Sequence, residues 1–313
     1  MRHILLLSVM VLCPTAMLRG QATYSDTSNG LVYTLSENPN IATVTGHSDN
    51  LAESIHISGT ISVDGKEYEV RLGEGVFKDC TSISKVNLLD LTGLTALPSS
   101  EFAGCTNLNT VALPASVTEI GDNAFDGCVR FDPSGVIRDG LVSIGECAFR
   151  GCYNLADEEI SELRIPGTVK SVGDGAFYNC KIHTVAIYPL DQSDPEETLD
   201  IGSQAFYNNK YPMNYIYCGY FTPPVLRGTD FAPLQFNATL FVNPGRDQAY
   251  AAANGWKNFS GGIWTGIDGL YESIQSTFPV YNLKGVQVGV ASDPSLSAFP
   301  SGIYIVNGRK VAR

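Results

Sequence analysis

The sequence predicts a β-rich solenoid, in which similar coils of chain stack and their strands form parallel sheets. Two observations carry this prediction: one short phrase recurs, and it does so at a nearly constant period. The phrase runs from a phenylalanine to a cysteine three residues later, with Asn209 replacing the last cysteine, and its phenylalanines are Phe77, Phe102, Phe125, Phe149, Phe177 and Phe206. They are 25, 23, 24, 28 and 29 residues apart, a spacing that favours a repeat array over unrelated amphipathic segments.

The clearest copy of the repeat is Leu108–Cys128. Val111 and Leu113 alternate with polar or small residues, which is typical of a strand with one buried face. Pro114 ends that strand and Gly121 permits a sharp turn. One coil of this size cannot enclose its own apolar side, so equivalent strands are expected to stack about 4.7–4.9 Å apart. Each phenylalanine should then lie above the previous one.

The pattern LxxVxLPxxVxxIGxxAFxGC is complete in Leu108–Cys128 and partial in Leu155–Cys180. It resembles the BspA-like leucine-rich repeats of bacterial surface proteins, over about residues 23–260. The resemblance implies a right-handed leucine-rich-repeat superhelix. It also implies an exported surface protein that binds other macromolecules, as adhesins do.

The composition limits the partners. The chain has 313 residues and a formal net charge of −12, with 17% charged and 44% hydrophobic residues. Residues 1–22 contain Arg2 and Arg19 and no acidic residue, so removing them changes −12 to −14. A chain this acidic is not drawn to nucleic acid or to an anionic membrane by its overall field. We expect an acidic, soluble surface and a monomer.

Residues 1–22 are predicted to be a signal peptide. Arg2 precedes the apolar run Ile4–Cys13, and Gly20–Ala22 offers a cleavage site between small residues. Cys13 leaves a lipoprotein as an alternative. No later segment has the length needed to span a membrane, so the prediction is export to the cell surface or the medium.

Residues 23–70 are predicted to form an N-terminal β cap over the first coil, because an uncapped solenoid exposes an apolar end. Asp64-Gly65 predicts a hairpin between Ile61–Val63 and Tyr68–Val70. Residues 71–260 are predicted to form the solenoid with its C-terminal cap. There we expect a short helix at Asp247–Ala253, with Trp256 and Phe259 folding back on Tyr250.

Two inserts lengthen the later coils, Ala156–Glu159 and Asp191–Glu197. Their polar character predicts surface loops. The second insert holds four carboxylates that a cation could use, but their spacing matches no calcium loop and the glycine of such loops is missing. A solvated loop is therefore expected; the carboxylates are Asp191, Asp194, Glu196 and Glu197.

Residues 261–313 are predicted to be a linker followed by a small β module. The Gly-rich run 260–267 is typical of a linker. Strands are expected around Lys284-Gly285 and around Asn307-Gly308. The final segment resembles the C-terminal tails of Bacteroidetes outer-surface proteins, some of which are sorting domains for type IX secretion. The alternative is a small β module that contacts the solenoid or hangs from it.

No motif in the sequence predicts catalysis. His47, His56 and His183 fall in different units and have no metal-ligand spacing, so no metal, no cofactor and no enzyme are predicted. A hydrolase built from loop residues is the least favoured alternative. Five cysteines occupy one position of successive coils, where their Cβ bonds point the same way. They are expected to be buried free thiols: Cys80, Cys105, Cys128, Cys152 and Cys180.

Alignment of the coils predicts the outward strand positions: Asn87, Ala112, Arg164, Ala186, Tyr217 and Phe241. Tyr188, Tyr215 and Glu162 lie nearby. Aromatic rings on a sheet face offer large contact area, so we expect a protein ligand there, with a glycan as the alternative. The predicted ligand-binding residues are Tyr188, Tyr215, Tyr217, Phe241, Arg164 and Glu162. The other possibility is that the tail module or the Trp256 helix covers this face.

Overall fold

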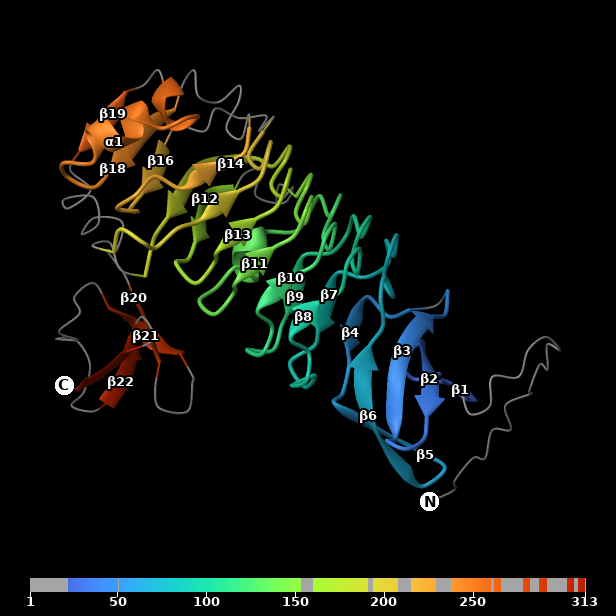
Figure 1. Cartoon of the computed structure of the whole chain (residues 1–313). Coiled ribbons are helices and arrows are strands. Elements are labelled where there is room, and N and C mark those ends of the chain that lie inside the picture. Colours follow the sequence, from blue (N-terminus) through green and yellow to red (C-terminus); the bar gives the residue numbers. More distant parts are fainter. Residues whose placement is uncertain are drawn as a thin grey trace.

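The computed structural model describes residues 22–49, 51–152, 160–190, 194–207, 215–228, 238–259 and 262–265, and four strands between 278 and 312. It shows a β-solenoid whose coils follow one another from an N-terminal sheet to a short C-terminal helix (Figure 1). The predicted fold class, a stack of coils with parallel sheets and little helix, is confirmed.

One long face of the solenoid is a single parallel sheet with one short strand per coil. Equivalent residues lie opposite each other: Glu119 is opposite Ser143, and Ser143 is opposite Ser171. The repeat period therefore equals one coil. The strands, in order, are β8 (Ala96–Leu97), β10 (Glu119–Ile120), β11 (Ser143–Ile144), β13 (Ser171–Val172), β15 (Asp200–Ile201) and β17 (Val225–Leu226).

The other face consists of two parallel sheets. The first holds β4 (Ser54–His56), β7 (Lys85–Asn87) and β9 (Thr110–Ala112). The second holds β12 (Ile160–Ile165), β14 (Ile182–Ile187), β16 (Tyr215–Cys218), β18 (Thr239–Val242) and β19 (Ile263–Thr265). Strand β19 corrects the sequence-based interpretation of 260–267 as a linker, because it pairs with β18 and extends the sheet.

The two sheets are separated by a coil that forms a 3-10 helix, η1 (Pro133–Gly135). The Asp132 side chain accepts a hydrogen bond from the backbone N–H of Ser134 at 2.9 Å and caps this turn. Pro133 has no N–H to give to a sheet and suits the first helical position. This coil therefore contributes no strand between β9 and β12, and the predicted ligand-binding residues all lie on the second sheet or directly after one of its strands.

The phenylalanines form the predicted column along the solenoid axis. The ring centroids of Phe102 and Phe125 are 5.4 Å apart, and those of Phe125 and Phe149 are 5.2 Å apart, with nearly parallel rings. Phe131 adds a ring 4.4 Å from Phe125. All these rings are buried. Contacts of the same kind continue to Phe206, so one shared core runs through the array.

The thiols lie beside this column. The Cys105 thiol donates to the carbonyl oxygen of Phe77 in the preceding coil at 2.9 Å, and Cys128 donates to Phe102 O at 2.9 Å. Cys152 and Cys180 repeat this contact. All seven cysteines after residue 22 are free, as predicted for the five aligned positions. Burial raises the pKa of the Cys105 thiol to about 12 and also raises those of Cys128, Cys152 and Cys180, so these four thiols are unreactive structural groups.

One position of the core departs from the repeat. Glu101 occupies the place that Ala124 and Ala148 hold in later coils, and its side chain is buried. Its Oε2 accepts a hydrogen bond from Val76 N at 3.3 Å, whereas no donor in the described part of the chain reaches Oε1. Burial raises the pKa of this carboxyl to about 8, and hydrogen bonds from Val76 and Gly75 partly oppose the shift. The group therefore favours its protonated form in the folded protein.

This carboxyl should make stability fall as the pH rises from about 4.5 to about 8. In that window the folded state holds a proton that the unfolded state has released. Each pKa unit of difference corresponds to about 1.4 kcal/mol, so the total loss is a few kcal/mol. Glu101→Gln keeps an acceptor for Val76 and removes the ionisation. Urea unfolding at pH 5 and pH 8 should show a smaller pH difference for this variant, and an unchanged difference would contradict the assignment.

The N-terminal cap is a sheet of five strands in the order β1 (Ala22–Ser25), β2 (Leu31–Ser36), β3 (Ile41–His47), β6 (Lys66–Leu72) and β5 (Thr60–Val63). Val63 lies opposite Lys66, and Asp64 and Gly65 have φ of 51° and 77°. This confirms the predicted two-residue hairpin. The His47 ring stacks on Phe77 at 6.2 Å and continues the phenylalanine column into the cap.

The C-terminal cap contains the predicted helix, α1 (Asp247–Ala252), which ends one residue earlier than expected. Gly255 has a φ of 80°, and the short 3-10 helix η3 (Trp256–Asn258) follows. The Trp256 ring meets Tyr250 edge-on at 5.3 Å, and its Nε1 donates to Pro224 O at 2.8 Å. The expected folding back of Trp256 onto Tyr250 is confirmed.

The C-terminal segment forms a separate antiparallel sheet, with its strands in the order β21 (Gln287–Ala291), β20 (Phe278–Tyr281), β22 (Ile303–Val306) and β23 (Arg309–Ala312) (Figure 1). Val306 lies opposite Arg309, so two residues connect these strands. Both predicted strand pairs are confirmed. Residues 1–21, which are all but the last residue of the predicted signal peptide, lie outside the described part of the chain.

Candidate functional site

The strand register of the second sheet places the predicted outward residues in one column. Arg164 lies opposite Ala186, Ala186 opposite Tyr217, and Tyr217 opposite Phe241. The inward neighbours of Tyr217, Ile216 and Cys218, have no exposed surface. The alternation of a strand therefore turns the column away from the core.

Three rings of this face are in mutual contact, and we call Tyr215, Tyr217 and Phe241 the aromatic cluster. Tyr217 and Phe241 stack with their centroids 5.0 Å apart, and Tyr215 lies 6.4 Å from Tyr217 and 6.0 Å from Phe241. These distances are those of favourable aromatic pairs. The His183 ring also lies near Tyr215 in a T-shaped arrangement, with the ring centroids 6.2 Å apart. Sequence reasoning missed His183 as a neighbour of the site.

The three rings are not equally accessible. Tyr215 is 40% exposed and Phe241 is half-buried, but Tyr217 is only 7% exposed. Burial raises the pKa of the Tyr217 phenol, and the nearby Tyr215 and Glu162 raise it further. Tyr217 therefore packs beneath Tyr215 and Phe241 and has little surface of its own for a ligand. The expectation that Tyr217 is an exposed binding residue is wrong in this respect. The accessible rings are Tyr215 and Phe241.

Tyr188 is the remaining aromatic residue of the predicted site. It follows β14 and lies next to the following coil, since a Cβ built at Gly219 would be 3.7 Å from Tyr188 Cδ1. Its side chain is half-buried. The structure therefore places Tyr188 at the end of β14, next to the following coil, and its role as a binding residue stays a prediction.

The two charged residues of the predicted site form a pair. Glu162 and Arg164 are both on β12, and Glu162 Oε1 accepts a hydrogen bond from Arg164 Nε. Glu162 is opposite Thr184, which in turn is opposite Tyr215. One strand, β14, therefore lies between the ion pair and the aromatic cluster. Phe241 is followed in the same column by Trp264 of β19, a position that was assigned to the linker on sequence grounds.

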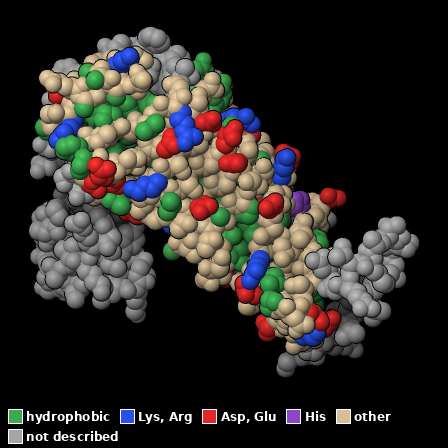
Figure 2. Space-filling view, in the orientation of Figure 1, with side chains coloured by type: hydrophobic (Ala, Val, Ile, Leu, Met, Phe, Trp, Pro, Cys, Tyr) green, Lys and Arg blue, Asp and Glu red, His purple; other side chains and the backbone are tan. Residues whose placement is uncertain are grey.

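Figure 2 shows where side chains of each kind gather on one side of the molecule. Hydrophobic side chains are frequent at the end where Figure 1 places β14, β16 and β18, with charged side chains interspersed. Such a mixture suits protein recognition, because interfaces combine apolar anchors with a polar rim.

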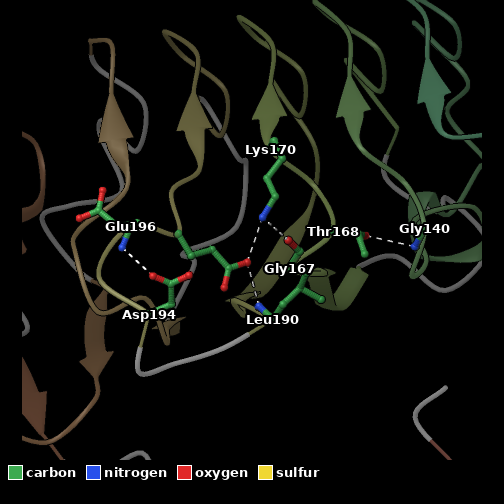
Figure 3. A network of polar contacts seen from close by, with 8 residues as sticks. Gly140, Gly167, Thr168, Lys170, Leu190, Asp194 and Glu196 are labelled. Carbon is green, nitrogen blue, oxygen red and sulfur yellow. Dashed lines mark hydrogen bonds and ion pairs between the residues drawn. The ribbon is translucent and has the colours of Figure 1, made fainter. Parts of the chain in front are cut away.

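The second acidic insert is not simply a solvated loop, which corrects the expectation for Glu197. Glu197 is 9% exposed, and its Oε1 accepts hydrogen bonds from Lys170 Nζ at 2.9 Å and from Leu190 N at 3.0 Å (Figure 3). Lys170 Nζ also donates to Gly167 O at 3.0 Å. This carboxylate ties the insert to the preceding coil. Exposed Glu196 donates its N–H to Asp194 at 2.8 Å, and Asp191 lies outside the described residues.

The described residues provide neither a metal site nor a membrane span. Among them, no group of three or more His, Cys, Asp or Glu side chains is placed to hold a metal ion. In the same part of the chain, no helix has both the length and the apolar character needed to cross a membrane.

Comparison with protein families agrees with this geometry. The model of the BspA type leucine rich repeat region, found in six copies, matches residues 133–218. This part of the chain is therefore similar to BspA-type leucine-rich repeats. The matched stretch includes β12, β14 and β16, so Tyr215 and Tyr217 lie inside this repeat region and Phe241 follows it. The resemblance seen in the sequence is thereby confirmed. None of the curated proteins matches the chain.

Several solved structures are similar to the chain. One is a leucine-rich repeat protein from Bacteroides ovatus, with 17% identity, a TM-score of 0.44, and coverage of 70% of this chain and 71% of that one. A second is the leucine-rich repeat protein TpLRR of T. pallidum, with 19% identity, a TM-score of 0.47, and coverage of 75% and 93%. A third is the pneumococcal vaccine antigen PcpA, with 12% identity, a TM-score of 0.41, and coverage of 79% and 99%.

Proposed function

We propose that this protein is an exported, non-catalytic cell-surface protein that binds another protein through the outer face of β14, β16 and β18. The observation that carries the proposal is the aromatic cluster, in which two accessible rings rest on a third that is nearly buried. The apolar run at residues 4–13 and the BspA-type repeat region support the surface location.

The geometry suits a protein partner. Tyr215 combines a broad apolar ring with a hydroxyl group, and Phe241 adds a purely apolar ring beside it. Both are held by Tyr217, so little conformational entropy is lost when a partner covers them. The Glu162–Arg164 pair adds polar groups at the margin. Aromatic anchors surrounded by polar residues are the usual composition of binding hot spots.

Removal of both accessible rings should weaken binding at least tenfold, while the loss of stability stays small enough for the protein to remain folded at the assay temperature. The test measures the binding of the Tyr215→Ala/Phe241→Ala variant to immobilised, purified extracellular-matrix proteins, beside its thermal midpoint. Hot-spot residues typically cost about 2 kcal/mol or more on truncation, which corresponds to a factor of about 30. Tyr217 is left in place because its burial would mix a stability effect into the result.

The matched control is Val225→Ala. Val225 is 56% exposed and lies on β17 of the opposite sheet. It therefore removes exposed apolar surface without touching the aromatic cluster, and binding should be unchanged. Equal binding by the wild type and the Tyr215/Phe241 double variant would show that the partner uses another surface.

A further inference from the structure

A hollow of about 600 Å³ opens at the edge of the solenoid where the coils turn at their phenylalanines. It lies away from the aromatic cluster and shares no residue with it. Three successive coils line it. Its size is within the range of small-molecule sites, which is about 300–1,000 Å³.

The middle coil contributes a glycine to the lining at a position where its neighbours carry side chains. The residue two positions before each phenylalanine has a left-handed backbone, with φ of 52° at Cys147, 61° at Gly175 and 59° at Gln204. Cys147 and Gln204 carry side chains on either side of Gly175. A Cβ at Gly175 would lie 3.3 Å from the Cys147 sulfur and 3.7 Å from Tyr178 Cβ. Gly175 therefore forms the floor.

One wall is aromatic and cationic. Tyr178 and Tyr207 stack with centroids 5.6 Å apart and an angle of 14° between the rings. Tyr178 and Arg150 line the hollow whereas Tyr207 does not, so Tyr207 supports Tyr178 from the far side. The Arg150 guanidinium is fixed by Asp126, which accepts its Nε–H at 2.8 Å. The wall is thus a supported ring beside an oriented guanidinium.

The rest of the lining carries hydrogen-bond acceptors. Glu146, Asp174 and Ser203 occupy one column of successive coils and line the hollow. Asp174 Oδ1 accepts the backbone N–H of Ser203 at 2.7 Å, which fixes this carboxylate. Glu146 is exposed, and its carboxylate has no hydrogen-bond or ion-pair partner among the described residues. Gln204 adds an amide that can donate and accept.

These walls select the chemistry of a ligand. The groups of three or more side chains that a metal ion needs are missing from the described residues. Two carboxylates disfavour an anion, because the guanidinium in the lining is already paired with Asp126. Charged walls disfavour an apolar ligand. A neutral sugar fits, since its hydroxyl groups donate to carboxylates and accept from the guanidinium and the amide, and its C–H face can lie on an aromatic ring.

We propose that this hollow binds a neutral saccharide unit of a glycan, with Tyr178 beneath its C–H face and Glu146, Asp174 and Arg150 around its hydroxyl groups. The open side of the hollow lets the rest of the glycan chain continue into solvent. The site is independent of the aromatic cluster, so the protein could hold a glycan at its edge and a protein on its sheet face.

The test fills the hollow. Gly175→Gln adds a long side chain to the middle coil. The next coil already has a glutamine, Gln204, at the equivalent position with the same backbone conformation. The full-length protein is first applied to an array of neutral and acidic glycans, and the best neutral oligosaccharide is then titrated. Gly175→Gln and Tyr178→Ala should each weaken its binding at least tenfold. Ser100→Gln is the control, because Ser100 has a φ of 57° at the same position of a distant coil.

Three results would overturn the proposal. The first is that no neutral glycan binds. The second is that Gly175→Gln binds the oligosaccharide as well as the wild type does. The third is a preference for acidic glycans or for a hexalysine peptide, which would mean that the hollow recognises charge. The Tyr215→Ala/Phe241→Ala variant should bind the oligosaccharide as the wild type does. This result would show that the hollow and the aromatic cluster are separate binding sites.

Discussion

Phe125→Ala should lower the free energy of unfolding by about 3–5 kcal/mol, the range measured for large aromatic truncations in cores. Phe125 is fully buried and contacts rings on both sides along the axis, Phe102 at 5.4 Å and Phe149 at 5.2 Å, as well as Phe131 at 4.4 Å. The alanine would leave a void that neighbouring coils cannot close, because their spacing is fixed by the parallel strands. Urea unfolding followed by circular dichroism measures the loss.

The matched control is Phe241→Ala, the same substitution at a half-buried ring on the outer face. It should cost about 1.5 kcal/mol or less, since fewer contacts are lost and solvent can fill the space. If the two variants lost equal stability, the phenylalanine column would not be the common core of the coils.

Gly145→Ala should be the second severe change. A Cβ at Gly145 would lie 2.6 Å from Asp122 Oδ1, 2.7 Å from Asp122 N and 2.7 Å from Gly121 C. Two of these atoms belong to the backbone of the preceding coil and cannot move aside. We expect a loss of about 3 kcal/mol or more, at the upper end of overpacking effects.

Gly127→Ala separates close approach from backbone strain. Gly127 has a φ of 73°, but the nearest atom to an added Cβ, the Cα of Gly104, is 4.0 Å away. The alanine is then destabilising only because it must adopt the left-handed conformation, which should lower the free energy of unfolding by about 1 kcal/mol. Thermal and urea unfolding of both variants should show the larger loss for Gly145→Ala. The reverse order would mean that the coils are farther apart at Gly145 than the structure shows.

Much of the fold could be predicted because the repeat encodes it locally. The period of the phenylalanines predicts one coil per repeat, and Asp64-Gly65 predicts the hairpin of the cap, since each signal depends on residues close in sequence. The column Arg164–Ala186–Tyr217–Phe241 followed from the same period. The break between β9 and β12 was not foreseen, although Asp132 and Pro133 provide a local signal for the 3-10 turn.

The accessibility of the candidate site could not be predicted in the same way. The alternation of β16 places Tyr217 outward, but it is only 7% exposed because the rings of Tyr215 on the same strand and Phe241 in the next coil pack against it. The hollow at Gly175 likewise depends on which side chains the coils before and after it carry. The position of a residue in the repeat predicts whether its side chain points outward. Its exposed fraction depends on side chains of other coils, which become neighbours only when the coils stack.

The sequence by itself determined the solenoid, the phenylalanine column, the free thiols beside it and both caps, because each of these repeats a contact or completes a local turn. Only the tertiary structure decided which outward rings are accessible, and that Glu197 turns inward to Lys170, 27 residues earlier. It also decided that residues 263–265 extend the sheet. These features depend on pairs of residues that differ from coil to coil, so the repeat pattern does not predict them. The partners come into contact only because the coils stack.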